Sequence, residues 1–117
     1  MFYRSTRNSN LKVESAQAIS QGISEDGGLF VPESIPSLTL DEIKYMSDLS
    51  YSCRAAYIFK KYLTDFTDVE IQYCTDNAYN TKNFETENIA EISHLFDGTY
   101  MLELWHGPTC AFKDMAL

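Results

Sequence analysis

Cysteine is scarce in this chain, and the few cysteines present follow no metal or disulfide pattern. The 117 residues include three, Cys53, Cys74 and Cys110, with no C-x-x-C pair. An odd number of isolated cysteines fits neither a disulfide framework nor a zinc site. No segment is long and apolar enough to span a bilayer, and the first residues lack the apolar core of a signal peptide. We therefore expect a protein of the reducing cytoplasm.

Basic residues are also few. Nine Lys and Arg stand against seventeen Asp and Glu, which gives a formal net charge of −8. The acidic residues are spread along the chain, so this charge describes a solvated surface and argues against nucleic acid or an anionic membrane as the partner. The sequence has no G-x-S-x-G, H-E-x-x-H or Walker loop, which leaves serine hydrolases, zinc proteases and P-loop enzymes without support.

Hydrophobic residues make up 44% of the chain and aromatic residues 14%, enough for one compact domain with a modest core. Two Thr-x-x-Glu pairs, Thr39 with Glu42 and Thr67 with Glu70, have the spacing of a capping box. Together with apolar periodicity they predict helices over 40–48, 52–64 and 68–79. A further helix is expected over 13–21, ended by Gly22, with Ala16, Ala18 and Ile19 available for burial.

Helix 52–64 and the residues just after it carry apolar side chains at spacings of three and four residues, which predicts a core stripe. Its members are Ala55, Ile58, Phe59, Tyr62, Leu63 and Phe66. Residues 2–6 are expected to form a short strand, and residues 24–32 a loop with a tight turn at its paired glycines. Two extended runs, 89–96 and 100–105, flank Asp97-Gly98-Thr99, a hairpin signal. These elements predict an α+β fold.

Lys113 is the strongest candidate for a catalytic residue. It lies where a strand gives way to a helix expected to begin near Phe112. The helix dipole and the apolar neighbours Ala111, Phe112 and Met115 both disfavour an ammonium ion there. A neutral amine condenses with an aldehyde, so the setting favours Schiff-base chemistry. A solvated surface lysine is the alternative interpretation.

Other polar residues offer weaker candidates. His106 lies near Lys113 in sequence but has no evident partner, and His94 falls within a strand as a packing or surface residue. Cys110 is interpreted as a small buried hydrophobe rather than a nucleophile. Arg4 and Arg7 attract an anion only if the first strand borders a cleft.

Three motifs, in order, are similar to those of the threonine synthase family, of the type with an extended N-terminal domain. They are Ser5-Thr6-Arg7, then 21–32 (QGISEDGGLFVP), then 103–114 (ELWHGPTCAFKD). The departures from the family pattern are small: Asn8 replaces a glycine, Trp105 a phenylalanine and Cys110 a leucine. Glu14 and Ser15 also replace the usual Ser-Phe.

This resemblance implies a pyridoxal 5'-phosphate enzyme of fold type II that converts O-phosphohomoserine and water to threonine and phosphate. It implies that Lys113 is both the catalytic residue and the residue that holds the cofactor covalently, with no metal. The cofactor serves as the electron sink of such chemistry.

The resemblance also implies two parts: 1–99 as the N-terminal domain, a small helical domain with a short antiparallel strand pair, and 100–117 as the first strand and turn of a truncated α/β catalytic domain. We expect the 117-residue piece to be inactive by itself, because one lysine does not make a cofactor site. Its C-terminal apolar residues are expected to pack back on the domain or against another copy. A related phospho-lyase and a non-catalytic interaction module remain alternatives.

Overall fold

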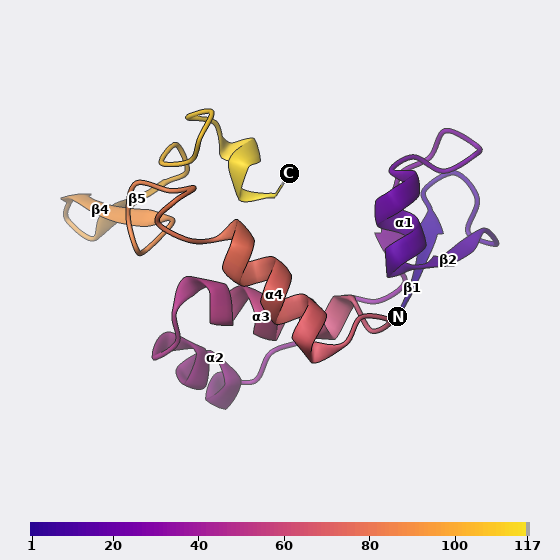
Figure 1. Ribbon diagram of the computed structural model, residues 1–117, viewed down its shortest axis with the longest axis horizontal. Helices are drawn as coiled ribbons and strands as arrows, with labels where there is room; N and C mark the ends of the chain where they lie inside the picture. Colours follow the sequence, from indigo (N-terminus) through magenta and orange to yellow (C-terminus); the bar gives the residue numbers. More distant parts are fainter. Residues whose placement is uncertain (117) are drawn as a thin grey trace.

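A computed structural model describes residues 1–116 of the chain, which measure 47 × 32 × 31 Å along the principal axes. Three groups of elements follow one another (Figure 1). A small sheet with helix α1 comes first, helices α2 to α4 form the middle, and a hairpin with a short 3-10 helix comes last. This mixture of helices and small antiparallel sheets confirms the α+β fold.

The first sheet has three antiparallel strands in the order β2-β1-β3. The central strand β1 (Phe2–Ser5) pairs with β2 (Lys12–Glu14) on one side. The prediction of a helix from residue 13 is therefore wrong at its start, because Val13 pairs with Tyr3 and is buried in the sheet. Helix α1 begins after this strand and spans Ser15–Gln21.

Strand β3 (Phe30–Pro32) pairs with the other side of β1. The sequence predicts a loop here, and that prediction is wrong for these three residues. Strand β3 is an edge strand, where a proline is tolerated because one row of its backbone groups needs no ladder partner.

Helix α1 ends as predicted at Gly22, whose φ of 72° carries the chain out of the helix. Its burial differs from the prediction: Ala18 is buried, but Ala16 and Ile19 are exposed. The helix packs mainly on β1 and β2, and most of its residues are exposed. Ser15, at the start of the helix, is completely buried.

The three middle helices form where capping and periodicity predict them. Helix α2 spans Leu40–Ser47, α3 spans Tyr51–Tyr62 and α4 spans Asp68–Ala78. Both predicted capping boxes are present, with Thr39 and Thr67 as the N-caps. Each satisfies backbone N–H groups that the first turn of a helix leaves without partners.

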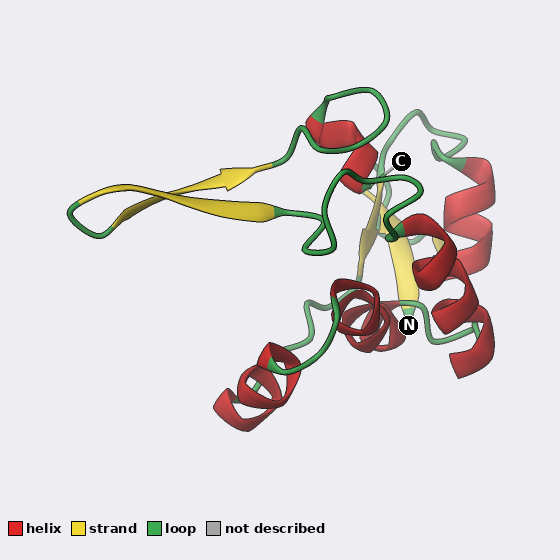
Figure 2. Ribbon diagram, turned by 60° about the vertical axis from the view of Figure 1, so that its left-hand side comes forward, coloured by secondary structure: helices red, strands yellow, loops and turns green. Residues whose placement is uncertain are grey.

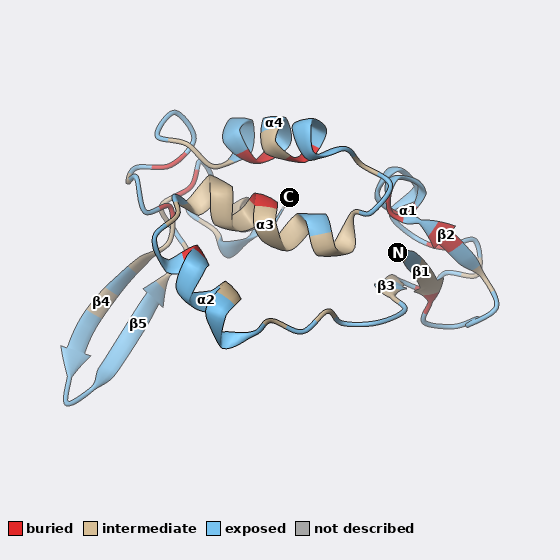
Figure 3. Cartoon of the chain, turned by 90° about the horizontal axis from the view of Figure 1, so that it is seen from below, coloured by how far each residue is buried: buried red, intermediate tan, exposed pale blue. Residues whose placement is uncertain are grey.

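Helices α3 and α4 pack against each other along their lengths (Figure 3). Ala56 of α3 and Ile71 and Thr75 of α4 are almost completely buried. The predicted core stripe on α3 is half-buried, not buried, because much of its surface borders a cavity described below.

Asp65, between α3 and α4, joins these helices to α1. Its carboxylate accepts a hydrogen bond from the backbone N–H of Ala16 (2.9 Å) and another from the Ser15 hydroxyl. It thereby caps α1, whose own N-cap residue Glu14 makes no side-chain capping bond. The Tyr3 hydroxyl adds a bond of 3.3 Å to the carbonyl of Tyr62.

The hairpin of β4 (Glu91–Phe96) and β5 (Thr99–Glu103) extends away from the helices (Figure 2). Asp97 and Gly98 have φ angles of 38° and 75°, as a type I′ turn requires, so the predicted turn is confirmed. Both strands are shorter than the predicted runs. Ile89 is buried and has a φ of 64°, so it lies outside the first strand.

Glu42 is the most heavily bonded acid of the helical part. It accepts bonds from Lys61 Nζ (2.6 Å), the Thr39 backbone N–H (2.7 Å) and the Tyr57 hydroxyl (2.9 Å). These donors, led by Lys61, lower the pKa of Glu42 to about 2 from 4.5. One carboxylate thus joins the start of α2 to two successive turns of α3.

Replacing this acid gives a test by pH. A group with a lowered pKa in the folded state stabilises the protein above its unfolded pKa and loses that effect as pH falls. We expect Glu42→Gln to be less stable than the original chain near neutral pH, with the difference fading between about pH 4.5 and about pH 2. Urea unfolding across this range measures it.

The matched control is Glu70→Gln, which alters the other capping box, where the pKa is lowered chiefly by the Thr67 hydroxyl and no lysine takes part. Its stability difference should depend less on pH. Equal differences for Glu42→Gln at both ends of the pH range would contradict the interpretation.

Candidate functional site

Lys113 lies in a 3-10 helix of four residues, η1 (Phe112–Met115), which follows the loop after β5. The predicted start of a helix near Phe112 is confirmed, and over the described residues this helix is of the 3-10 kind. The side chain of Lys113 is exposed, and Phe112 is 68% exposed. The apolar shielding expected around the amine is not supplied by these neighbours.

The carboxylate of Asp114 organises the loop that precedes Lys113. It accepts bonds from the Thr109 backbone N–H (2.9 Å), the Thr109 hydroxyl (2.6 Å) and the Ala111 N–H (3.4 Å). These bonds, chiefly that of the Thr109 hydroxyl, lower the pKa of Asp114. Within residues 1–116, no carboxylate forms an ion pair with the Lys113 ammonium.

Gly107 packs directly against this acid. A Cβ atom added at Gly107 would lie 2.5 Å from the Cβ of Asp114, closer than real side chains approach. The carbonyl of Gly107 also accepts the backbone N–H of Cys110 at 3.1 Å. Cys110 is exposed and has a φ of 54°, so the prediction of a buried hydrophobe is wrong.

His106 stands at the start of the same loop with two acidic partners. Its Nδ1 lies 3.0 Å from Glu85 Oε2, and its Nε2 lies 2.6 Å from Glu103 Oε2. The hydrogen bonds to Glu85 and Glu103 raise the pKa of His106, against the opposing effect of burial. Neither partner was found from the sequence, and Glu85 is far from His106 along the chain.

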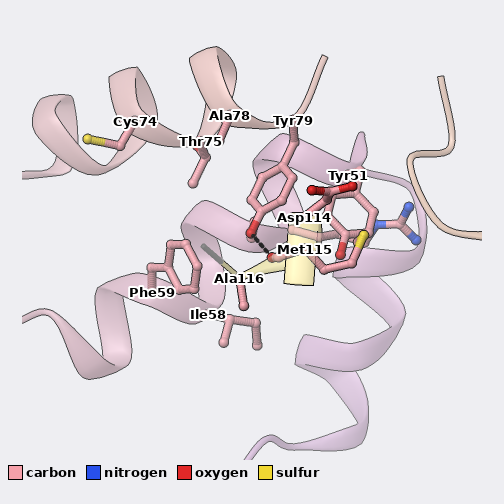
Figure 4. Close-up of a pocket in the computed structure, with 12 residues that line it drawn as sticks. Tyr51, Ile58, Phe59, Cys74, Thr75, Ala78, Tyr79, Asp114, Met115 and Ala116 are labelled. Atoms are coloured by element: carbon pink, nitrogen blue, oxygen red, sulfur yellow. Dashed lines mark hydrogen bonds between the residues drawn. The ribbon is translucent and has the colours of Figure 1, made fainter. Parts of the chain in front are cut away.

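A mostly apolar cavity of about 690 Å³ lies between α3, α4 and η1 (Figure 4). Tyr79 reaches across it, and its hydroxyl donates a 2.7 Å bond to the carbonyl of Met115. Asp114 and Ala116 also line the cavity, whereas Lys113 does not. The cavity is adjacent to the lysine segment but does not contain the amine.

The Ser-Thr-Arg and Asp-Gly-Gly motifs lie together and are joined by hydrogen bonds. The Ser5 hydroxyl donates to the Asp26 carboxylate, with its oxygen 2.7 and 2.9 Å from the two carboxylate oxygens, and the Gly28 N–H donates to the same carboxylate (2.9 Å). Gly27 has a φ of 77°, and a Cβ at Gly28 would lie 2.2 Å from the Ser5 hydroxyl oxygen. The glycines therefore serve a tight turn and a close approach.

The remaining polar candidates have local partners. Arg4 pairs with Glu33 at 3.2 Å, and Arg7 donates a 3.1 Å bond to the Asp26 carbonyl. His94 is exposed, with its ring 5.1 Å from that of Tyr100. Over residues 1–116 no cluster of three metal-ligating side chains occurs, and no helix is long and apolar enough to cross a membrane.

Comparison with known proteins places these features in a family. A family profile described as "Threonine synthase N terminus" matches residues 2–79. The chain therefore belongs to the threonine synthase family.

Individual relatives match over almost all of this chain. Threonine synthase of Eremothecium gossypii is 37% identical over 98% of the chain, and threonine synthase-like 2 of Mus musculus is 33% identical over all of it. The crystal structure of threonine synthase from Brucella melitensis, bound to pyridoxal phosphate (PLP), superposes with a TM-score of 0.88 at 28% identity over 97% of the chain. In each case the chain spans 24% of the relative's length.

The loop geometry gives a prediction at Gly107. Because an added Cβ collides with Asp114, we expect Gly107→Ala to break the bonds from Thr109 and Ala111 to that carboxylate. Hydrogen exchange of the Thr109 and Ala111 amides should then be faster by about tenfold, the effect of one lost charged hydrogen bond.

Gly98→Ala is the matched control, because Gly98 has a φ of 75° but an added Cβ there meets nothing within 4 Å. It strains the tip of the hairpin and should leave the amides of Thr109 and Ala111 unchanged. Unchanged exchange in Gly107→Ala would show that the close approach does not hold the loop.

Proposed function

We propose that this chain is the N-terminal part of a threonine synthase that uses pyridoxal 5'-phosphate to convert O-phosphohomoserine and water to threonine and phosphate. The observation that carries the proposal is the match of both sequence and fold to threonine synthases over nearly the whole chain. When bound, the cofactor supplies an electron sink for bond breaking at the substrate's carbons. We place the protein in the cytoplasm, with no nucleic acid or membrane as partner.

Within this function, Lys113 is the catalytic residue and the covalent anchor of the cofactor. Its amine is exposed and the neighbouring Asp114 carboxylate is occupied by Thr109 and Ala111, so the amine remains accessible to an aldehyde. The residues present therefore fit this half of the site. The amine also serves to move protons at the substrate while phosphate departs.

The proposed division assigns 1–99 to the N-terminal domain and 100–117 to the beginning of the catalytic domain. The described residues offer an anchoring amine, whereas their glycine turn at Gly27 is filled by the Ser5–Asp26 bonds and leaves no cradle for a phosphate. The cofactor phosphate and ring must then be held by other residues, so the 117-residue chain alone is inactive.

Lys113→Ala tests the role of the amine. In the longer protein that carries this chain, added pyridoxal phosphate should produce the absorbance of a covalent cofactor–lysine linkage, and the substitution should abolish it. Phosphate release from O-phosphohomoserine should fall by at least about a thousandfold, as for loss of a covalent catalyst.

Lys82→Ala is the control, since it removes another exposed lysine. It should retain both the absorbance and the activity. Normal covalent cofactor binding by Lys113→Ala would refute the assignment, and phosphate release by the purified 117-residue chain would refute its predicted inactivity.

A second candidate is a phospho-lyase that acts on a related substrate. It is favoured by the similarity to threonine synthase-like 2 of Mus musculus, which matches the whole chain nearly as well as the threonine synthases do. Comparing O-phosphohomoserine with other small phosphorylated amino acids separates the two activities. A non-catalytic interaction module, in contrast, would show no covalent cofactor in the longer protein.

We also propose that the isolated chain associates with a second copy through its C-terminal segment. The predicted packing of this segment back on the domain is not seen for Leu102, Trp105 and Phe112, which are 56%, 45% and 68% exposed. Among the described residues, β4 and β5 pair with each other alone, so each has a free edge next to this apolar surface.

Sedimentation equilibrium of the 117-residue chain should therefore show a concentration-dependent dimer. Leu102→Lys, which places a charge on the strand, should shift the equilibrium to monomer. Ile35→Lys is the control, because Ile35 is 82% exposed but lies far from the hairpin in sequence and outside every strand. A chain that stays monomeric at high concentration would contradict self-association.

A further inference from the structure

His106 lies between two groups that can only accept hydrogen bonds when ionised. Glu85 faces Nδ1 at 3.0 Å and Glu103 faces Nε2 at 2.6 Å. A neutral imidazole has one N–H and so can donate to only one of them, whereas the imidazolium donates to both. The arrangement of the three side chains therefore selects the charged ring.

This imidazolium joins two parts of the fold. Glu85 belongs to the segment after α4, and Glu103 ends β5. A backbone bond from the Glu85 N–H to the His106 carbonyl (3.0 Å) reinforces the same junction. The histidine side chain is only 14% exposed and that of Glu103 17%, so the shorter of the two ion pairs is also the better shielded from solvent.

The junction continues directly into the segment that carries Lys113. The buried Gly107 follows His106 and is packed against Asp114, the residue after the lysine. Beyond the lysine, the carbonyl of Met115 is held by Tyr79 at 2.7 Å. The backbone that carries Lys113 is thus held on both sides, and His106 lies at the start of the N-terminal side.

The charged groups around the ring favour its protonation. Besides Glu85 and Glu103, Glu91 of β4 lies opposite Glu103 in the hairpin register, and the Ser93 hydroxyl of β4 donates to Glu103. Asp114 packs against Gly107, the residue after His106. Loss of the ring's proton would leave several carboxylates close together with one fewer cation between them.

We propose that His106 is a positioning residue for Lys113: as an imidazolium bound by Glu85 and Glu103 it fixes the loop of residues 107–112, and its deprotonation releases that loop. This inference rests on the function proposed above for Lys113, but the geometry of the loop can be measured without that function. The side-chain bonds of His106 go to Glu85 and Glu103, so its effect on the Lys113 amine is indirect.

The sign of the pH effect follows from the pairing. The folded-state pKa of His106 is raised above 6.5, chiefly by the bond to Glu85 and then by that to Glu103. A raised pKa means that the pair stabilises the loop fully below about pH 6.5 and that this effect is lost as pH rises through the folded-state pKa. The loop should therefore loosen on the alkaline side.

Two substitutions separate charge from shape. His106→Arg keeps a cation with several donors that does not titrate in this range, so the loop should stay fixed at alkaline pH. His106→Gln has a single neutral amide group and should leave the loop loosened at every pH. His94→Gln removes the only other histidine, which is exposed on the hairpin, and serves as the control.

The decisive measurement is hydrogen exchange of the 117-residue chain, expressed as protection factors so that the intrinsic pH dependence of exchange cancels. Protection of the Thr109 and Ala111 amides should fall by about tenfold through the titration of His106 in the original chain and in His94→Gln. It should stay high in His106→Arg and be low throughout in His106→Gln. Protection of the Ile71 and Thr75 amides in α4 should not change.

Superposable protection profiles for the original chain and His106→Arg would overturn the proposal. A parallel loss in α4 would also overturn it, because it would show general unfolding and no local positioning. In the longer protein, the rate of covalent cofactor attachment should show the same alkaline loss, again absent in His106→Arg. If that protein binds no pyridoxal phosphate, the proposed function fails, while the exchange result still decides the role of His106.

Discussion

Carboxylates that accept backbone N–H groups hold this chain in shape. Five carboxylates accept a backbone N–H that no regular helix or sheet satisfies; four of these bonds fix a local turn or helix start, and that of Asp65 joins distant segments. Such bonds are charge-assisted and stronger than bonds between neutral groups. The five bonds run from Thr39 to Glu42 (2.7 Å), Thr67 to Glu70 (2.8 Å), Gly28 to Asp26, Ala16 to Asp65 and Thr109 to Asp114 (2.9 Å each).

This reliance on carboxylates follows from the small core. Seven hydrophobic residues are buried in the part of the chain that the structure describes, and they are scattered over the sheet, the helices and the segment after α4. Burial at these points cannot by itself define how one part meets the next. The acidic composition, which from the sequence suggests only a solvated surface, therefore includes several residues with specific structural partners.

The sequence predicts what is determined locally and fails where a distant partner decides. The capping boxes at Thr39 and Thr67 involve residues three apart, so α2 and α4 are predicted almost to the residue. Strand β3 forms because β1, which is distant in the sequence, pairs with it. Val13 likewise joins the sheet despite a sequence that suits the following helix, since pairing with Tyr3 outweighs local preference.

The same distinction applies to the candidate site. The motif around Lys113 is contiguous and identifies the lysine, and the Asp114–Thr109 bonds lie within it. The partners of His106 could not be predicted, because Glu85 is brought to it only by the fold of the segment after α4. The expected apolar shielding of the amine by Phe112 is not seen, because Phe112 is itself exposed.

The position of the proposed catalytic lysine and the charge on its amine are therefore controlled by different parts of the protein. Bonds of Asp114 on one side and Tyr79 on the other hold the backbone that carries Lys113, whereas the side chain of Lys113 is exposed. Preorganised position is worth much to a nucleophile, because the entropy of orienting it is paid on folding. Lowering the charge on the amine requires desolvation, which an exposed side chain does not have. In the proposed threonine synthase, the residues that enclose the cofactor must supply that desolvation, and the amine becomes reactive only when they cover a loop that is already in place.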